Sequence, residues 1–158
     1  MTNPTPQQRI ENEVKTAMKS GEKEKLSTLR MLLTEIKNER IRRGGEVDED
    51  GFVSLVRKAI KQREESVSQY RKGNREELAA KEESEIKMLE VFLPAQVDEG
   101  QIRAAVEEIV AEKGLSGPAA MGPIMKGVMA RFGTAADGAT INRIAREVLA
   151  KDAAKNAG

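Results

Sequence analysis

The sequence contains neither cysteine nor histidine. The lack of cysteine excludes disulfides, thiolate zinc sites and a cysteine nucleophile, and it is compatible with a reducing compartment, for which we expect the cytoplasm. The lack of histidine removes the usual general base, the commonest transition-metal ligand and every triad built on that residue. The enzyme classes that depend on these two side chains are therefore excluded.

Aromatic residues and long apolar runs are also scarce. Only 3% of the residues are aromatic and tryptophan is absent, whereas 34% are charged. The abundance of Ala, Glu, Lys, Leu and Arg favours helices and argues against a β-sandwich. The amino terminus "MTNPTPQQRIENEV" lacks the apolar core of a signal peptide, and no run approaches the roughly 20 apolar residues of a membrane span. We expect an unprocessed, soluble chain with no membrane partner.

Net charge does not indicate a nucleic-acid partner, because 27 basic residues are nearly cancelled by 26 acidic ones. A nucleic-acid partner would need a local basic face. Arg30, Lys37 and Arg40 stand near one another at helical spacing, and Arg42 and Arg43 follow. This basic patch is either a contact surface or a solvated face balanced by neighbouring glutamates. We prefer the second interpretation, since charge-rich helices commonly have such faces.

Apolar residues recur every three or four positions in seven segments, and this periodicity predicts an all-α fold. Thr5-Pro6 is the predicted start of the first helix, and Asn74 and Asp98 are predicted to cap the fourth and fifth. The last two helices are predicted at about residues 118–132 and 138–151, followed by a frayed tail. The predicted helix ends are Gly21, Gly44-Gly45, Gly73, Pro94 and Gly114.

The composition changes near "LPAQVD", residues 93–98. Before this point the helices are long and dense in charge, and after it the chain is rich in Ala, Gly and Met. We therefore predict two domains. Residues 1–93 form an amino-terminal domain of helical hairpins, and residues 97–152 form a small carboxy-terminal three-helix domain.

The stretch "MGPIMKGVMARFGTAADGATIN" combines four glycines with apolar and basic residues. Gly127 lies inside a predicted helix, where glycine costs up to about 1 kcal/mol relative to alanine. A close approach of another backbone explains this glycine better than direct ligand contact. Gly133 is predicted to end the helix in a left-handed conformation, and Asp137 to cap the next one. The predicted apolar stripe of the first helix is Met121, Ile124, Met125, Val128 and Met129.

The start of the last helix is also a possible phosphate site. Its first backbone N–H groups, from Gly138 on, are expected to lie near Lys126, Arg131 and Arg143. Asp137 argues against tight anion capture there, because its carboxylate would occupy the donors.

Other sites of recognisable chemistry are missing. There is no P-loop and no dinucleotide fingerprint after a strand. The acidic run at residues 46–50 lacks the ligand ladder of an EF-hand and is better explained as a solvated helix start. Chance proximity on helical surfaces accounts for any pairing of serine with lysine. We assign no catalytic residue, no metal and no cofactor.

Three stretches carry a pattern that covers nearly the whole chain: "LSTLRMLLTEIKNERI", "YRKGNREELAAKEESEIKMLEVFLPAQVDEGQI" and "MGPIMKGVMARFGTAADGATINRI". The most specific pieces are the step Leu93-Pro94-Ala95-Gln96, and Gly127-Val128-Met129 followed by Gly133 and Ala136-Asp137-Gly138. In these pieces the chain resembles the stand-alone YqeY-like proteins of the GatB/YqeY family.

This resemblance implies an all-α fold with an amino-terminal helical domain and a smaller carboxy-terminal domain. The second domain is similar to the tail of the B subunit of the glutamine-dependent tRNA amidotransferase, where the tail is an appendage that contacts RNA. The family label of carbon–nitrogen ligase activity with glutamine as amido-N-donor is treated as an association through this shared tail. The nucleic-acid-binding residues implied are Lys126, Gly127, Arg131, Gly133, Gly138 and Arg143.

We therefore expect an accessory module that binds tRNA, or an enzyme that handles tRNA, through its carboxy-terminal domain and without a catalytic centre of its own. One alternative is a subunit-like participant in tRNA-dependent amidation. Another is a protein-interaction adaptor that uses the helical face around Arg30, Lys37 and Arg40. The oligomeric state is left open.

Overall fold

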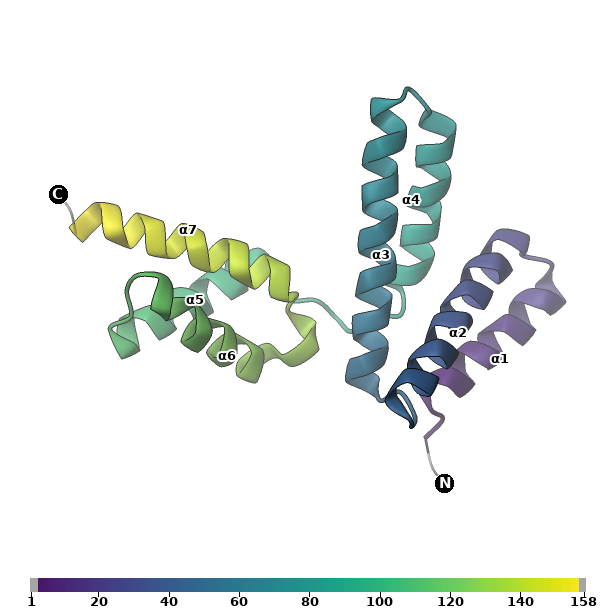
Figure 1. Ribbon diagram of the computed structural model, residues 1–158, viewed down its shortest axis with the longest axis horizontal. Helices are drawn as coiled ribbons and strands as arrows, with labels where there is room; N and C mark the ends of the chain where they lie inside the picture. The colour runs from purple at the N-terminus through teal and green to yellow at the C-terminus, as the bar shows by residue number, and fades with distance from the viewer. Residues whose placement is uncertain (1–2, 157–158) are drawn as a thin grey trace. The chain divides into compact units, whose positions relative to one another are not determined.

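The computed structural model describes residues 3–156, and every regular element in that range is helical (Figure 1). This confirms the predicted all-α class. Contacts between Cα atoms divide the chain into two compact units that meet between Leu93 and Pro94. We call them the amino-terminal and carboxy-terminal units; the proposed division into two domains stays a prediction.

The amino-terminal unit consists of two helical hairpins. Helix α1 (Pro6–Ser20) lies beside α2 (Lys23–Arg43), and α3 (Glu49–Lys72) lies beside α4 (Glu76–Glu90) (Figure 1). The Phe52 ring is fully buried, its centroid is 6.1 Å from that of Phe92, and the Arg9 guanidinium lies over it at 5.5 Å. The buried core of this unit is Ile10, Ala17, Leu29, Leu32, Ile36, Val47, Phe52, Val56, Ile60 and Leu89.

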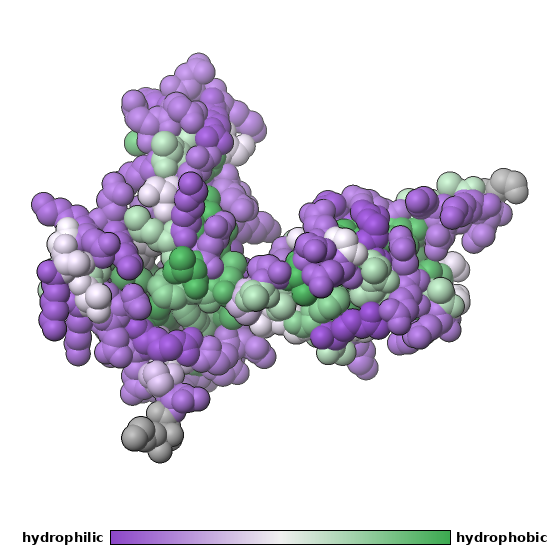
Figure 2. Space-filling view, turned by 180° about the vertical axis from the view of Figure 1, so that it is seen from behind, coloured by the Kyte–Doolittle hydropathy of each residue, from purple (hydrophilic) through white to green (hydrophobic). Residues whose placement is uncertain are grey.

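The carboxy-terminal unit is a three-helix arrangement. It contains α5 (Glu99–Lys113), α6 (Met121–Phe132) and α7 (Gly138–Asn156), with short 3-10 turns at Pro118–Ala120 and Gly133–Ala135. Each of the three helices contacts the other two. In Figure 2 the hydrophobic residues (green) are bordered by hydrophilic ones (purple). This is expected when each helix buries its apolar side and turns its polar side to solvent. The centre of the core is Ile102, Val106, Ile124, Val128, Ile141 and Ile144.

Local chemistry explains most helix ends. The Thr5 side chain accepts a hydrogen bond from the Gln8 N–H, and the Thr5 N–H donates to the Gln8 side-chain oxygen, so that α1 starts in a capping box. Asp98 and Gln101 make the same arrangement at the start of α5. Gly21, which ends α1, has φ of 73°, a conformation that favours glycine. The predicted ends at Gly44 and Gly114 are likewise confirmed.

Three local predictions are wrong. Asn74 does not cap α4: it has φ of 58° in the turn, and α4 follows Arg75 without a side-chain cap. Helix α4 ends at Glu90 rather than at Pro94, because Leu93 donates to the Glu90 carbonyl in a tighter turn before the proline. Helix α7 continues to Asn156 instead of fraying from residue 151, since alanine and lysine there are good helix formers.

Arg63 of α3 is a buried cation, with only 7% of the residue exposed. Its Nε donates to Glu85 Oε2 of α4 at 3.0 Å, and Nη1 donates to the Ala59 carbonyl at 3.0 Å. Nη2 lies 3.6 Å from the sulfur of Met31 of α2. Arg63 therefore joins three helices of the two hairpins, and the carboxylate of Glu85 compensates its charge.

We expect Glu85→Ala to lower the free energy of unfolding by about 3 kcal/mol, because it leaves a buried guanidinium without its anion. Replacing both partners, in Arg63→Met/Glu85→Leu, should lower the free energy of unfolding clearly less than Glu85→Ala does, because no buried charge is left without a partner. Glu46→Ala, which removes a half-exposed pair with Arg40, is the matched control and should change stability by less than about 1 kcal/mol. Urea unfolding of the full chain, followed by circular dichroism, measures all three. Equal losses for Glu85→Ala and Glu46→Ala would contradict this role of Arg63.

Candidate nucleic-acid interface

Helix α6 buries the predicted apolar stripe against α5 and α7. Ile124 and Val128 are fully buried, Met121 and Met125 are half-buried, and Met129 is exposed. Spacings of three and four residues place these side chains on one side of the helix. Ile124 and Val128 of the predicted stripe are therefore core, Met121 and Met125 pack against it, and Met129 does not belong to it.

Gly127 of α6 lies against the side chain of Ile109 of α5. A Cβ atom added at Gly127 would lie 2.7 Å from Cδ1 of Ile109, closer than real Cβ contacts. Gly122 of the same helix differs, because a Cβ there would meet nothing within 4 Å. The predicted close neighbour of Gly127 was another backbone, whereas the nearest atoms are those of the Ile109 side chain. A contact of Gly127 with nucleic acid stays a prediction.

The other two glycines of the predicted site lie at the junction of α6 and α7. Gly133 ends α6 with φ of 56° and ψ of −137°, so its φ is positive as predicted but its ψ is not that of a left-handed helix. Gly138 is the first residue of α7, and an added Cβ would make only an ordinary contact with Met125. The Ile141 N–H donates to the Asp137 carbonyl at 3.0 Å, which places Asp137 at the start of α7 as predicted.

The three predicted cations differ in their partners. Lys126 is exposed and forms no ion pair with any residue between 3 and 156. Arg131 is also exposed, and its Nη1 lies 3.0 Å from Glu108 Oε2 of α5. Arg143 of α7 is bound by Glu99 of α5 and, at 3.1 Å, by Glu147 of its own helix. Lys126 and Arg131 thus share α6, whereas Arg143 belongs to a separate network.

That network extends to Arg103 of α5, which also binds Glu147. The Arg103 guanidinium, and after it that of Arg143, hold the pKa of the Glu147 carboxyl below its usual value. All of these side chains remain well exposed to solvent. Ion pairs of this kind contribute little to stability, and phosphate oxygens can compete for their arginines.

Carboxylates are absent from the whole stretch of residues 114–136, which includes α6 and both 3-10 turns. The same stretch carries Lys126 and Arg131. Four of the eight acidic residues of the unit lie on α5: Glu99, Glu107, Glu108 and Glu112. The charged residues of α6 itself are therefore only positive, although Glu108 of α5 pairs with Arg131 and the unit as a whole has no excess of positive charge.

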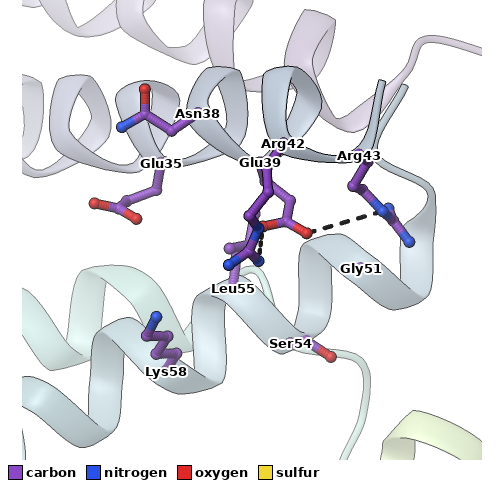
Figure 3. A pocket seen from close by; sticks show the side chains of 9 residues that line it. All are labelled: Glu35, Asn38, Glu39, Arg42, Arg43, Gly51, Ser54, Leu55 and Lys58. Carbon is purple, nitrogen blue, oxygen red and sulfur yellow. Dashed lines mark hydrogen bonds and ion pairs between the residues drawn. The ribbon is translucent and has the colours of Figure 1, made fainter. Parts of the chain in front are cut away.

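A second candidate site is a polar hollow of about 390 Å³ between α2 and α3, shown in Figure 3. Glu35 and Lys58 point toward it from opposite helices, and Glu39 is bound by Arg42 and, at 3.9 Å, by Arg43. Since both signs of charge are present, the hollow favours neither anions nor cations strongly. The residues that line it are Glu35, Asn38, Glu39, Arg42, Arg43, Gly51, Ser54, Leu55 and Lys58.

Sequence reasoning did not find this hollow, because its residues come from two helices and share no local spacing. It did expect that glutamates would balance the basic patch, and this holds for three of its arginines. Besides the contacts to Glu39, Arg43 lies 3.5 Å from Asp48, and Arg40 lies 2.9 Å from Glu46.

Neither candidate site contains a recognisable catalytic arrangement. Between residues 3 and 156, no three carboxylate side chains are placed to hold a metal ion. In the same range, no helix combines the length and the apolar character that crossing a membrane requires. The side chains of both sites can bind a ligand through hydrogen bonds and through their charge.

A model of the family described as Yqey-like protein matches residues 7–149. The chain is similar to "Altered inheritance of mitochondria protein 41, mitochondrial" from three fungi. The identity is 38% in Vanderwaltozyma polyspora, over 53% of this chain and 46% of the relative. It is 33% in Lachancea thermotolerans, over 69% and 60%, and 30% in Pyrenophora tritici-repentis, over 89% and 79%.

Two facts follow from these relatives. The chain spans about half the length of the first two of them. The relatives are named as mitochondrial proteins, so the prediction of a cytoplasmic location was wrong. The physical reason is that a lack of cysteine excludes disulfides but does not identify a compartment.

We expect Gly127→Ala to gain little or none of the roughly 1 kcal/mol of helix propensity that alanine offers, because the terminal methyl group of Ile109 has to move aside. Gly138→Ala is the control, because an added Cβ there makes only an ordinary contact with Met125, and it should stabilise by up to about 1 kcal/mol. Ile109→Val removes the overlapping atom, so the combined Gly127→Ala/Ile109→Val variant should lose less than the sum of the two single changes. Thermal unfolding measures each variant, and an equal gain from both glycine replacements would refute the packing role.

Proposed function

The chain belongs to the Yqey-like protein family, and from this premise we propose that it is an accessory module without its own catalytic centre that contacts tRNA, or an enzyme handling tRNA, through α6. The observation that carries the proposal is the carboxylate-free stretch of residues 114–136 with its exposed Lys126 and Arg131. Phosphates bind to such a surface by charge, and the module positions RNA rather than making or breaking bonds.

The state of the two α6 cations supports this proposal. Lys126 has no carboxylate partner within residues 3–156, so binding of a phosphate does not require an ion pair to break. Arg131 has to exchange Glu108 for a phosphate, and the side chains of Arg131 and Glu108 are each about half exposed. An exposed ion pair contributes little to stability, so replacing Glu108 by a phosphate costs little free energy. Arg143 is held by two carboxylates and is the weaker candidate.

The mode of recognition follows from the lack of aromatic side chains. Phe132 is the only aromatic residue after Phe92, and it packs against the carboxy-terminal core. Proteins that read single-stranded RNA stack bases on exposed aromatic rings, and α6 offers none. We therefore propose recognition of a folded RNA by shape and phosphate position, as suits a tRNA.

The relation to amidation is part of the same proposal. The resemblance to the tail of the tRNA amidotransferase B subunit suggests that this chain holds or delivers the tRNA on which another protein acts. The chain has no cysteine or histidine with which to release ammonia from glutamine by the usual nucleophile and base. A glutamine-dependent step would therefore belong to a partner enzyme.

Filter binding of the full chain to tRNA over a range of salt concentrations tests the proposal. We expect Lys126→Ala/Arg131→Ala to weaken binding and to reduce the slope of log affinity against log salt by about 1.5, the value for two lost phosphate contacts. Glu108→Gln should strengthen binding, because it releases Arg131.

The matched control is Lys113→Ala/Lys155→Ala, which removes the same charge from exposed positions in the same unit. It should leave the slope nearly unchanged. The proposal fails if tRNA binds no better than unstructured RNA of equal length and the α6 double variant binds like the unmodified chain.

A further inference from the structure

One face of α2, formed by Arg30, Thr34, Lys37 and Ile41, is exposed to solvent along its length. The spacing of four, three and four residues places these side chains in one row on the helix. Ile41 is 79% exposed, the highest value among the exposed large hydrophobic residues of the described chain, of which Val91 is next at 73%. We call this row the α2 face. It combines two cations with an apolar side chain at its carboxy-terminal end.

The cations of the α2 face have no partners, unlike their neighbours in the predicted basic patch. Neither Arg30 nor Lys37 forms an ion pair with any described residue, whereas Arg40 is bound by Glu46. Glu35 lies to one side of the row, where it borders the hollow of Figure 3. The positive charge of Arg30 and Lys37 is therefore not neutralised within the amino-terminal unit.

A hollow of about 600 Å³ lies beside Ile41 and Lys37. One wall is Gln7 of α1, whose Nε2 donates to Glu11 at 2.9 Å while its Oε1 is buried and has no donor. Another wall is the Gly44-Gly45 step, where added Cβ atoms would meet nothing within 4 Å. The buried Gln7 Oε1 is not accessible to a ligand, so what the hollow offers is an apolar side chain beside a backbone that is open to approach.

We propose that the α2 face binds an acidic polypeptide segment of a partner protein, which places an apolar side chain beside Ile41. Two carboxylates of the segment bind Arg30 and Lys37, which lie about 10 Å apart along the helix. This function goes beyond the proposed contact with RNA and does not rest on it, because it uses a different unit and a different helix.

The composition of the face favours a polypeptide over RNA. Phosphates would be attracted by Arg30 and Lys37, but they gain nothing from an exposed aliphatic side chain, and the face has no aromatic ring on which a base could stack. An acidic segment with one apolar residue uses every group of the face. Such an anchor beside complementary charges is how small protein interfaces obtain both affinity and specificity.

A random peptide library displayed on phage, selected on the immobilised full chain, tests this proposal. We expect the enriched peptides to carry Asp or Glu together with an aliphatic or aromatic residue. Synthesised and measured by fluorescence anisotropy, they should bind Ile41→Ser and Lys37→Glu at least about tenfold more weakly than the unmodified chain. Both positions are exposed, so circular dichroism should show both variants folded.

Met18→Ser is the matched control, since it removes an exposed apolar side chain from α1 and should leave the affinity unchanged. Labelled oligouridine is measured on the same variants. The proposal is overturned if no acidic peptide is enriched, or if the enriched peptides bind both α2 variants as they bind the unmodified chain. It is also overturned if oligouridine alone binds and its binding is lost in Lys37→Glu but kept in Ile41→Ser, because the face would then serve RNA.

Discussion

The burial of one side of α6 against α5 and α7 is the constraint on which the carboxy-terminal unit depends. Ile124 and Val128 are fully buried on that side, and Ile109 of α5 fills the space beside Gly127. Because this side faces the core, Lys126 stays exposed, and Arg131 is exposed within reach of Glu108 of α5. The burial of this side of α6 thus decides which of its charges the unit presents.

The two units differ in whether the ion pairs of their arginines are buried or exposed. In the amino-terminal unit Arg63 is buried and compensated by Glu85, and this pair cannot exchange partners without loss of stability. In the carboxy-terminal unit the arginines pair with carboxylates at the surface, where exchange for another anion is easy. The first arrangement suits a scaffold that holds the α2 face, and the second suits a surface that binds and releases phosphates.

Much of the fold could be predicted from the sequence because helix ends depend on local chemistry. Gly21, Gly44 and Gly114 end helices where the spacing of apolar residues indicated, and Asp98 caps α5. Two features could not be predicted from the spacing of apolar residues: Asn74 lies in the turn instead of capping α4, and α4 ends early, at Glu90. Both depend on the geometry of the turns.

The candidate site was predicted less completely, because its partners are distant in sequence. Glu108 is 23 residues from Arg131, and Glu99 is 44 residues from Arg143, so no local pattern revealed that these arginines are occupied. A packing role for Gly127 could be predicted, since a glycine inside a helix needs a structural reason.

We propose that the exposed side of α6, whose own residues include no carboxylate, contacts folded RNA while Gly127 stays packed against α5. The most direct test is a titration of the isotope-labelled full chain with tRNA, followed residue by residue by NMR. We predict that amide shifts concentrate in residues 118–135, with the Ile109 methyl signals unchanged. Shifts confined to other helices, with α6 unaffected, would contradict it.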